Sequence, residues 1–187
     1  MPLPLSLHTA RLVLRPFDEE DARIVKELVN HPEIAAGILN IPLPYTLQDA
    51  EVWIGQHAVA RDRGEEYVFA VTEQSGNLVG ATSIRVNEEH GHGELGYWIG
   101  MAAKGKGYAT ETVGSMLEFG FIGLGLHRIY ARHLSWNIAS GKVLRKSGLK
   151  YEGRMRGHAF RWGTFHDIEV YGILREEFIA GFLDRKE

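Results

Sequence analysis

The sequence contains no cysteine among its 187 residues. Disulfide bonds, thiolate zinc sites and an acyl-cysteine intermediate are therefore excluded, so any acyl transfer must use another nucleophile or go directly to the acceptor. The Gly-x-Ser-x-Gly motif of serine hydrolases is also absent, and that class of enzyme is disfavoured with it.

Long apolar runs are missing as well. No uninterrupted apolar stretch approaches the roughly twenty residues of a membrane span, and residues 1–5 lack the basic region and apolar core of a secretory signal. We therefore expect a soluble, cytoplasmic protein with no membrane partner. Linkers, repeats and low-complexity tracts are absent, and 44% of the residues are apolar, which predicts a single domain over residues 1–187.

Charge is distributed unevenly, although the net charge is only −3. Residues 101–163 contain eleven Lys and Arg residues against three Glu residues. Two interpretations fit this excess: the segment binds a polyanionic ligand, or it is a solvated basic surface. The segment has no recognisable nucleic-acid-binding motif, so we expect no direct binding of nucleic acid.

A glycine-rich turn lies within this basic segment. Residues 104–107, Lys-Gly-Lys-Gly, follow a predicted strand over residues 95–99 and lead into an amphipathic helix that begins near Ala109. Backbone N–H groups at such a helix start, with the positive end of the helix dipole behind them, form an anion site. Glycine lets a diphosphate approach the backbone and permits positive φ. The plainer interpretation is a tight connection with two solvated lysines.

Two well-known phosphate-binding motifs do not fit this turn. The P-loop pattern matches from Gly100 to Lys106, but Gly107 occupies the position of its magnesium-binding hydroxyl, which argues against ATP hydrolysis. The dinucleotide fingerprint fails because Thr110 stands in place of its last glycine and no carboxylate lies near Tyr130.

The turn instead resembles the acetyl-CoA pyrophosphate loop of the GNAT N-acetyltransferase superfamily. That pattern is Arg or Gln, two residues, Gly, any residue, and then Gly or Ala. Here it runs from Lys104 to Ala109, with Lys in place of Arg or Gln. The backbone contacts that the pattern describes do not depend on that side chain.

Two further stretches resemble the RimJ/RimL branch of the superfamily. The first is Asn137-x-x-Ser140, followed by Lys-x-Gly and then by Glu-Gly at residues 152–153. The second is residues 41–46, Ile-Pro-Leu-Pro-Tyr-Thr, which in that branch border the acceptor site. A proline-fixed connector with Tyr45 in the core explains the second stretch equally well.

This resemblance implies an α+β GNAT fold, a mostly antiparallel mixed sheet of about seven strands flanked by helices, in the order βααβββαβαββα, with strands four and five splayed apart. Patterning alone predicts only α+β. The expected strands are residues 12–17, 67–72, 78–87, 92–100, 128–134, 155–162 and 164–174. The expected helices follow N-caps at Asp18, Thr46 and Asn137, with others from Ala109 and over residues 176–182. Prolines and a glycine predict irregular structure between residues 32 and 44.

The resemblance also implies acetyl-CoA as co-substrate and no metal. The cofactor-binding residues that it implies are Ile99, Lys104, Gly105, Lys106, Gly107, Tyr108, Ala109, Thr110, Asn137, Ser140 and Lys142. Ser140 would donate a proton to the departing sulfur, and Asn137 would hydrogen-bond the pantetheine arm. The His-x-His stretch within residues 88–92 is interpreted as a solvated turn and not as a metal site.

The general base has several candidates. Glu94 is the first choice, because the strand that carries it borders the reaction centre in the family. Asp167, Glu169 and His133 are the alternatives. Glu94 can equally be the strand partner of a nearby arginine.

The predicted function is an acetyl-CoA-dependent N-acetyltransferase that transfers the acetyl group directly to a primary amine, the amine of a protein or peptide N-terminus. A small-molecule acceptor (an amino sugar, polyamine or amino acid) is the alternative within enzymes. A non-catalytic CoA-binding sensor is the alternative outside them. Residues 38–45 and 155–167 are expected to decide the acceptor, and family resemblance implies a homodimer.

Overall fold

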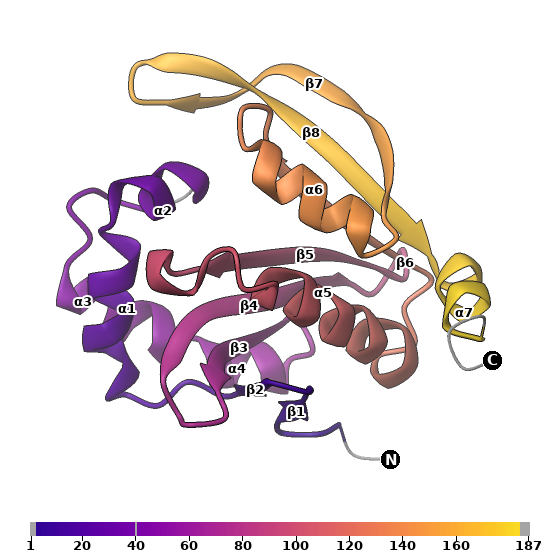
Figure 1. Cartoon of the computed structure of the whole chain (residues 1–187), viewed down its shortest axis with the longest axis horizontal. Helices are drawn as coiled ribbons and strands as arrows, with labels where there is room; N and C mark the ends of the chain where they lie inside the picture. The colour runs from indigo at the N-terminus through magenta and orange to yellow at the C-terminus, as the bar shows by residue number, and fades with distance from the viewer. Residues whose placement is uncertain (1–2, 40, 184–187) are drawn as a thin grey trace.

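The computed structural model describes residues 3–39 and 41–183 (Figure 1). Met1 and Pro2, at the start of the predicted domain, and Asn40, within the predicted acceptor segment, lie outside the described residues, as do residues 184–187. The strands are β1 Leu7–His8, β2 Leu12–Arg15, β3 Glu66–Glu73, β4 Leu78–Asn87, β5 His92–Ile99, β6 Arg128–Leu134, β7 Lys150–Arg161 and β8 Thr164–Leu174. The helices are α1 Asp21–Val29, α2 Pro32–Gly37, α3 Leu47–Gly55, α4 His57–Asp62, α5 Tyr108–Glu118, α6 Ile138–Lys146 and α7 Arg175–Leu183.

The strands form one sheet in the order β1-β2-β3-β4-β5-β6-β8-β7. Every neighbouring pair is antiparallel except β5 and β6, which are parallel. The fold is therefore the mixed, mostly antiparallel α+β sheet that was expected, with eight strands in the described part of the chain in place of about seven. The additional strand is β1, whose two residues are too short to give an alternating pattern in the sequence.

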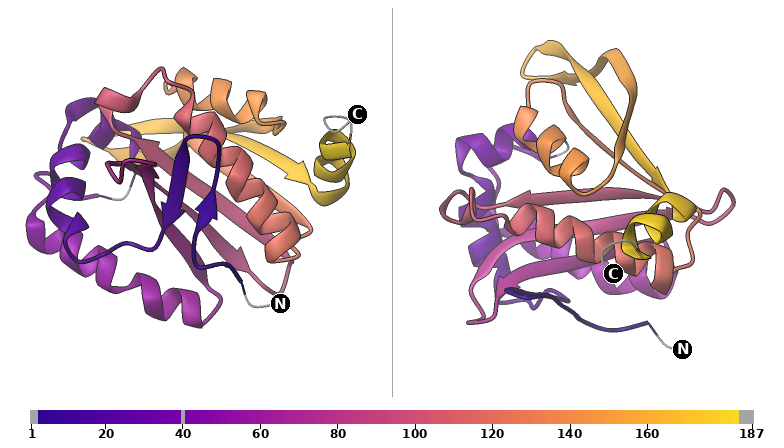
Figure 2. Two further views of the ribbon diagram at one scale, coloured as in Figure 1. Left: turned by 60° about the horizontal axis from the view of Figure 1, so that its bottom comes forward. Right: turned by 45° about the vertical axis from the view of Figure 1, so that its right-hand side comes forward.

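Helices pack on both faces of the sheet because its central strands are apolar on both sides. In β3 six consecutive residues are buried, with Phe69 facing the core under α5 and α6, and Ala70 facing the core under α1 and α3. α6 and the β7–β8 hairpin rise away from the other strands (Figure 2). No helix in residues 3–39 and 41–183 is both long and apolar enough to cross a membrane.

The parallel pair β5 and β6 separates after four residues. Pairing runs from His92 opposite Arg128 to Leu95 opposite Ala131, whereas β5 continues to Ile99 and β6 to Leu134. These are the fourth and fifth of the strands predicted from the sequence, and their expected splay is confirmed. The separated half of β5 thus has a free edge toward β6.

Three local predictions were wrong. Pro32 does not break regular structure but occupies the first turn of α2, where a missing N–H costs nothing. β7 begins at Lys150 and not at residue 155, because irregular pairing with β8 interrupts its alternation. Asp18 is not the cap of α1; its N–H donates to the Asp21 carboxylate, and the helix begins at Asp21.

Candidate active site

The glycine-rich turn joins β5 to α5 in a conformation that needs its glycines. Gly105 has φ +76° and Gly107 has φ +83°, both in the left-handed region that L side chains rarely adopt. Gly107 is the N-cap of α5 and offers no side-chain acceptor. The first N–H groups of this 11-residue helix therefore have no intrahelical or capping partner. The turn presents the expected row of backbone donors.

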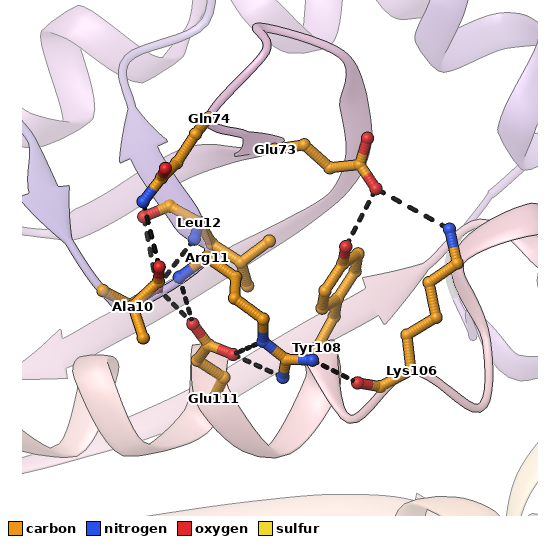
Figure 3. A network of polar contacts seen from close by, with 9 residues as sticks. Ala10, Arg11, Leu12, Glu73, Gln74, Lys106, Tyr108 and Glu111 are labelled. Atoms are coloured by element: carbon orange, nitrogen blue, oxygen red, sulfur yellow. Dashed lines mark hydrogen bonds and ion pairs between the residues drawn. The ribbon is translucent and has the colours of Figure 1, made fainter.

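A network of ion pairs holds this turn in place (Figure 3). Arg11 donates from one terminal nitrogen to the backbone oxygen of Lys106 at 2.7 Å, and its other nitrogens contact the Glu111 carboxylate at 2.6 and 2.7 Å. Burial would raise the pKa of Glu111, but hydrogen bonds from Thr9 and Arg11 outweigh burial and hold that pKa below its usual value. The turn is thus anchored to the chain just before β2.

The two lysines of the turn are paired with carboxylates from other elements. The Nζ atom of Lys104 lies 3.4 Å from Glu33 of α2, and that of Lys106 lies 3.7 Å from Glu73 of β3. Glu73 also accepts a 2.9 Å hydrogen bond from the Tyr108 hydroxyl. An anionic ligand at the turn must therefore compete with these carboxylates for the lysines. The Lys104 N–H already donates to the Met101 oxygen at 3.1 Å, whereas the first N–H groups of α5 have no capping partner.

A cleft of about 650 Å³ runs from this turn to the first turn of α6, and we call it the loop cleft. It is lined by the turn, by residues 97–99 of β5, by α2, by residues 136–140 and by Val143. Its walls include the free edge left by the splay of β5 and β6. A long, narrow ligand with an anionic end at the turn fits this shape.

A second cleft, of about 680 Å³, lies on the other side of β5, and we call it the α3 cleft. It is lined by α1, α3, the connection between α2 and α3, and β3 to β6. Tyr97, Trp98, Gly37 and Ile38 line both clefts. The two clefts therefore adjoin along these four residues, and we call this place their junction.

The first turn of α6 reaches this junction. Asn137 caps α6 and accepts a 3.2 Å hydrogen bond from the Ser140 backbone N–H. The Ser140 hydroxyl lies 2.8 Å from the Tyr97 hydroxyl. Asn137 and Ser140 line the loop cleft beside Ile99 of β5, so three of the predicted site residues lie within one cleft with the glycine-rich turn.

Comparison with known proteins identifies the family. The family described as "Acetyltransferase (GNAT) domain" matches residues 11–150, three quarters of the chain. The chain belongs to the GNAT acetyltransferases. It is therefore an N-acetyltransferase that uses acetyl-CoA, and the resemblance drawn from the glycine-rich turn is confirmed.

Individual relatives cover nearly the whole chain. It is 28% identical to "Uncharacterized N-acetyltransferase p20" of Bacillus licheniformis, over 92% of this chain and 98% of the relative. The solved ribosomal-protein-S5-alanine acetyltransferase of Vibrio fischeri has a TM-score of 0.83 at 19% identity, covering 94% and 99% of the two chains. The spermidine N-acetyltransferase of Vibrio cholerae, solved with CoA and spermine, has a TM-score of 0.81 at 24% identity, covering 91% and 99%. These two structural likenesses are evidence of a common fold.

Two predicted site residues of this acetyltransferase lie apart from the turn and from both clefts. Glu94 is in the paired half of β5, where Arg132 donates to it at 2.7 and 2.8 Å and the Tyr130 hydroxyl donates at 3.3 Å. Lys142 is exposed on α6. Glu94 therefore has the arginine partner that its alternative interpretation anticipates, and its role as base stays a prediction.

The other candidate bases occupy different surroundings. Glu169 is buried and accepts from Arg154 at 2.6 and 2.8 Å, and Asp167 accepts from the backbone N–H of Gly157. His133 is buried and lines the α3 cleft, with Nδ1 2.8 Å from the Leu134 oxygen. That contact requires Nδ1 to carry the proton, so Nε2 holds the lone pair in the neutral ring. Among the residues that the structure describes, no group of three or more His, Asp or Glu side chains is placed to hold a metal ion.

Sequence reasoning missed two residues of the site. Tyr97 could have been found, because strand alternation places it on the same face as Leu95 and Ile99. Arg11 gives no local signal, since its partners lie 95 and 100 residues further along the chain.

Replacing Arg11 with methionine is expected to weaken acetyl-CoA binding about fivefold, because the backbone at Lys106 loses its charged donor. The turnover number should change little, since Arg11 lines neither cleft. Titration calorimetry measures the affinity. Arg63→Met is the control, because the Arg63 side chain is 66% exposed and lies 4.0 Å from its carboxylate partner. Equal losses in both variants would contradict a specific role for Arg11.

Proposed function

We propose that the loop cleft binds acetyl-CoA and that the α3 cleft receives the acceptor amine. The diphosphate lies against the backbone N–H groups of residues 104–110, and the pantetheine arm follows the free edge of β5 past Ile99. The acetyl group then lies at Tyr97 and Trp98. The observation that carries this assignment is the meeting of the two clefts at these residues.

The proposed reaction is direct attack of the amine on the thioester. The nitrogen forms a bond to the acetyl carbon, the carbon–sulfur bond breaks, and the proton that the nitrogen loses ends on the sulfur. Ser140, at the CoA side of the junction, donates a hydrogen bond to the departing sulfur. A thiol has a pKa of about 8.5, so the leaving group needs only modest help.

The acceptor amine needs only weak general-base catalysis from the protein. An N-terminal amine has a pKa of about 8, so part of it is neutral at pH 7 without a strong base. Glu94 remains the proposed base, working through water because it lines neither cleft. Its ion-pair partner Arg132 lines the α3 cleft.

The charges of the α3 cleft favour a peptide acceptor over a polyamine. Asp49 is the single carboxylate among its lining residues in the described chain, and it already accepts from the Thr46 hydroxyl and backbone N–H. Arg85 and Arg132 also line the cleft, each paired with a carboxylate outside it, Glu66 at 3.3 Å and Glu94 at 2.7 Å. A polyamine would bring further positive charges to these guanidinium groups, whereas a peptide brings one amine, which is consumed in the reaction.

The apolar part of the cleft supports the same acceptor. Trp53, Trp98 and Tyr45 contribute aromatic surface beside aliphatic side chains of α1 and of the connection to α3. Such a surface can bind the first side chains of a peptide, and Arg85 and Arg132 can pair with an acidic residue further along that peptide. We therefore propose a protein or peptide N-terminus, with apolar and acidic residues close to it, as the acceptor.

A thiol-release assay with acetyl-CoA tests this proposal. Short peptides with free N-termini, carrying apolar residues followed by Asp or Glu, are compared with spermidine, glucosamine and free amino acids. We expect kcat/KM for the best peptide to exceed that for spermidine at least about tenfold, with mass spectrometry locating one acetyl group on the N-terminal nitrogen. The same peptide with a blocked N-terminus is the control. Faster turnover of spermidine, or of a sugar amine, would contradict the assignment.

A further inference from the structure

The Tyr97 hydroxyl lies within hydrogen-bonding distance of the Ser140 side chain. Tyr97 belongs to the unpaired half of β5 and lines both clefts at their junction. Its hydroxyl lies 2.8 Å from the Ser140 hydroxyl oxygen and 3.3 Å from the Ser140 backbone oxygen. The shorter of these contacts is of ordinary length for a hydrogen bond between two hydroxyl groups.

Neighbouring contacts fix the position of Ser140 relative to β5. Asn137 caps the helix through the Ser140 N–H. At Gly141, a Cβ atom would lie 2.9 Å from His133 Nε2 and 3.2 Å from the Tyr171 hydroxyl, so the first turn of α6 approaches β6 and β8 more closely than a side chain allows. The separation of the two hydroxyl groups is therefore set by the packing of α6 on the sheet.

Tyr97 keeps its proton throughout the pH range of the reaction. Burial raises its pKa to about 12, and the hydrogen bond with Ser140 offsets only part of this rise. A thiol has a pKa of about 8.5, so net transfer of the Tyr97 proton to a thiolate is unfavourable. The hydroxyl can therefore serve as a hydrogen-bond donor and not as the source of the proton.

We propose that Tyr97 is a positioning residue for acetyl transfer: its O–H donates to Ser140 Oγ and so directs the Ser140 O–H toward the thioester sulfur. A serine hydroxyl rotates freely and would otherwise find other acceptors. When Ser140 Oγ accepts the hydrogen bond from Tyr97, the Ser140 hydroxyl hydrogen must point away from Tyr97. It then points into the loop cleft, which Ser140 lines. Two hydroxyl groups in series also polarise each other, which strengthens the bond to the sulfur as negative charge develops.

The proton balance of this step needs no additional donor. The amine nitrogen loses one proton as the amide forms, and the sulfur gains one as the carbon–sulfur bond breaks. Ser140 and Tyr97 both end the cycle as neutral hydroxyl groups. This inference rests on the proposed placement of acetyl-CoA in the loop cleft.

A double-mutant cycle tests the role of Tyr97. Tyr97→Phe is expected to lower kcat about tenfold, the effect of one lost hydrogen bond to a group that gains charge, with the acetyl-CoA affinity within about twofold of wild type. Because Tyr97 acts through Ser140, the double variant Tyr97→Phe/Ser140→Ala should be no slower than Ser140→Ala alone. Tyr67→Phe is the control, since Tyr67 is a buried tyrosine in the core under α5 and α6 and lines neither cleft.

Several results would overturn the inference. A wild-type kcat in Tyr97→Phe would do so. A double variant about tenfold slower than Ser140→Ala would also do so, because it would show an effect of Tyr97 independent of Ser140. A parallel loss in Tyr67→Phe would indicate a general effect of removing a buried hydroxyl. The cycle uses whichever acceptor the thiol-release screen yields, so an acceptor other than a peptide overturns the proposed substrate and leaves the test of Tyr97 intact.

Discussion

Replacing Gly107 with valine is expected to weaken acetyl-CoA binding at least about a hundredfold. Gly107 has φ +83°, and a β-branched residue in that region is a severe outlier. Its Cβ would also lie 3.4 Å from an Arg11 nitrogen, beside the guanidinium that holds the Lys106 oxygen. The substitution therefore disturbs the backbone donors at the start of α5 and places a side chain over them.

Titration calorimetry with acetyl-CoA measures this loss, and Gly125→Val provides the matched control. Gly125 has φ +70°, a Cβ atom added to it would meet no other atom within 4 Å, and it lines neither cleft. Both substitutions should lower the free energy of unfolding by about 1–2 kcal/mol or more, because both force a side chain into the left-handed region. Only Gly107→Val should lose binding. Equal affinities in the two variants would contradict the assignment of the diphosphate to this turn.

Replacing Ser140 with alanine is expected to lower kcat roughly ten- to a hundredfold while acetyl-CoA still binds. The variant removes the hydroxyl at the junction of the clefts but keeps the backbone N–H that Asn137 caps, so α6 should begin where it does now. The loss is limited because a thiolate is already a fair leaving group.

Steady-state kinetics with the best acceptor and calorimetry with acetyl-CoA separate these two effects. Ser147→Ala is the matched control, since Ser147 is a buried serine at the other end of α6 whose hydroxyl has no hydrogen-bond partner in the described structure and lines neither cleft. A Ser140→Ala variant with wild-type kcat would remove Ser140 from the mechanism. A loss confined to acetyl-CoA affinity, with kcat unchanged, would assign it to binding alone.

The features that could be predicted from the sequence are those set by neighbouring residues. The positive φ angles of Gly105 and Gly107 follow from a tight turn into a helix, and Asn137 caps α6 as its position before the apolar pattern indicates. Thr46 likewise caps α3, in a reciprocal capping box with Asp49. Local chemistry of this kind is enough to locate the glycine-rich turn and the first turn of α6.

The remaining features depend on contacts between distant parts of the chain. Tyr97 and Ser140 are 43 residues apart, and Lys104 and its partner Glu33 are 71 residues apart. No spacing rule connects such pairs, since the pairing of strands and the packing of helices bring them together. The α3 cleft is a stronger example, because α1, α3 and four strands line it. Its charges come together only once those elements are assembled.

Proline shows why one residue type can mislead. Pro32 was expected to interrupt regular structure, yet it begins α2, where His31 accepts from the Glu33 N–H as the cap. A proline both stops a helix that precedes it and suits the first turn of a helix that follows. The sequence on either side did not distinguish these two outcomes, and α2 proved to line both clefts.

A crystal structure of the protein with CoA tests the central claim most directly. The claim is that backbone N–H groups of residues 104–110 hold the diphosphate of the coenzyme. The expected result is diphosphate oxygens within hydrogen-bonding distance, about 2.7–3.2 Å, of amide nitrogens in this turn, with the thiol end near Tyr97 and Ser140. A diphosphate bound elsewhere on the protein, with the turn empty, would contradict the account.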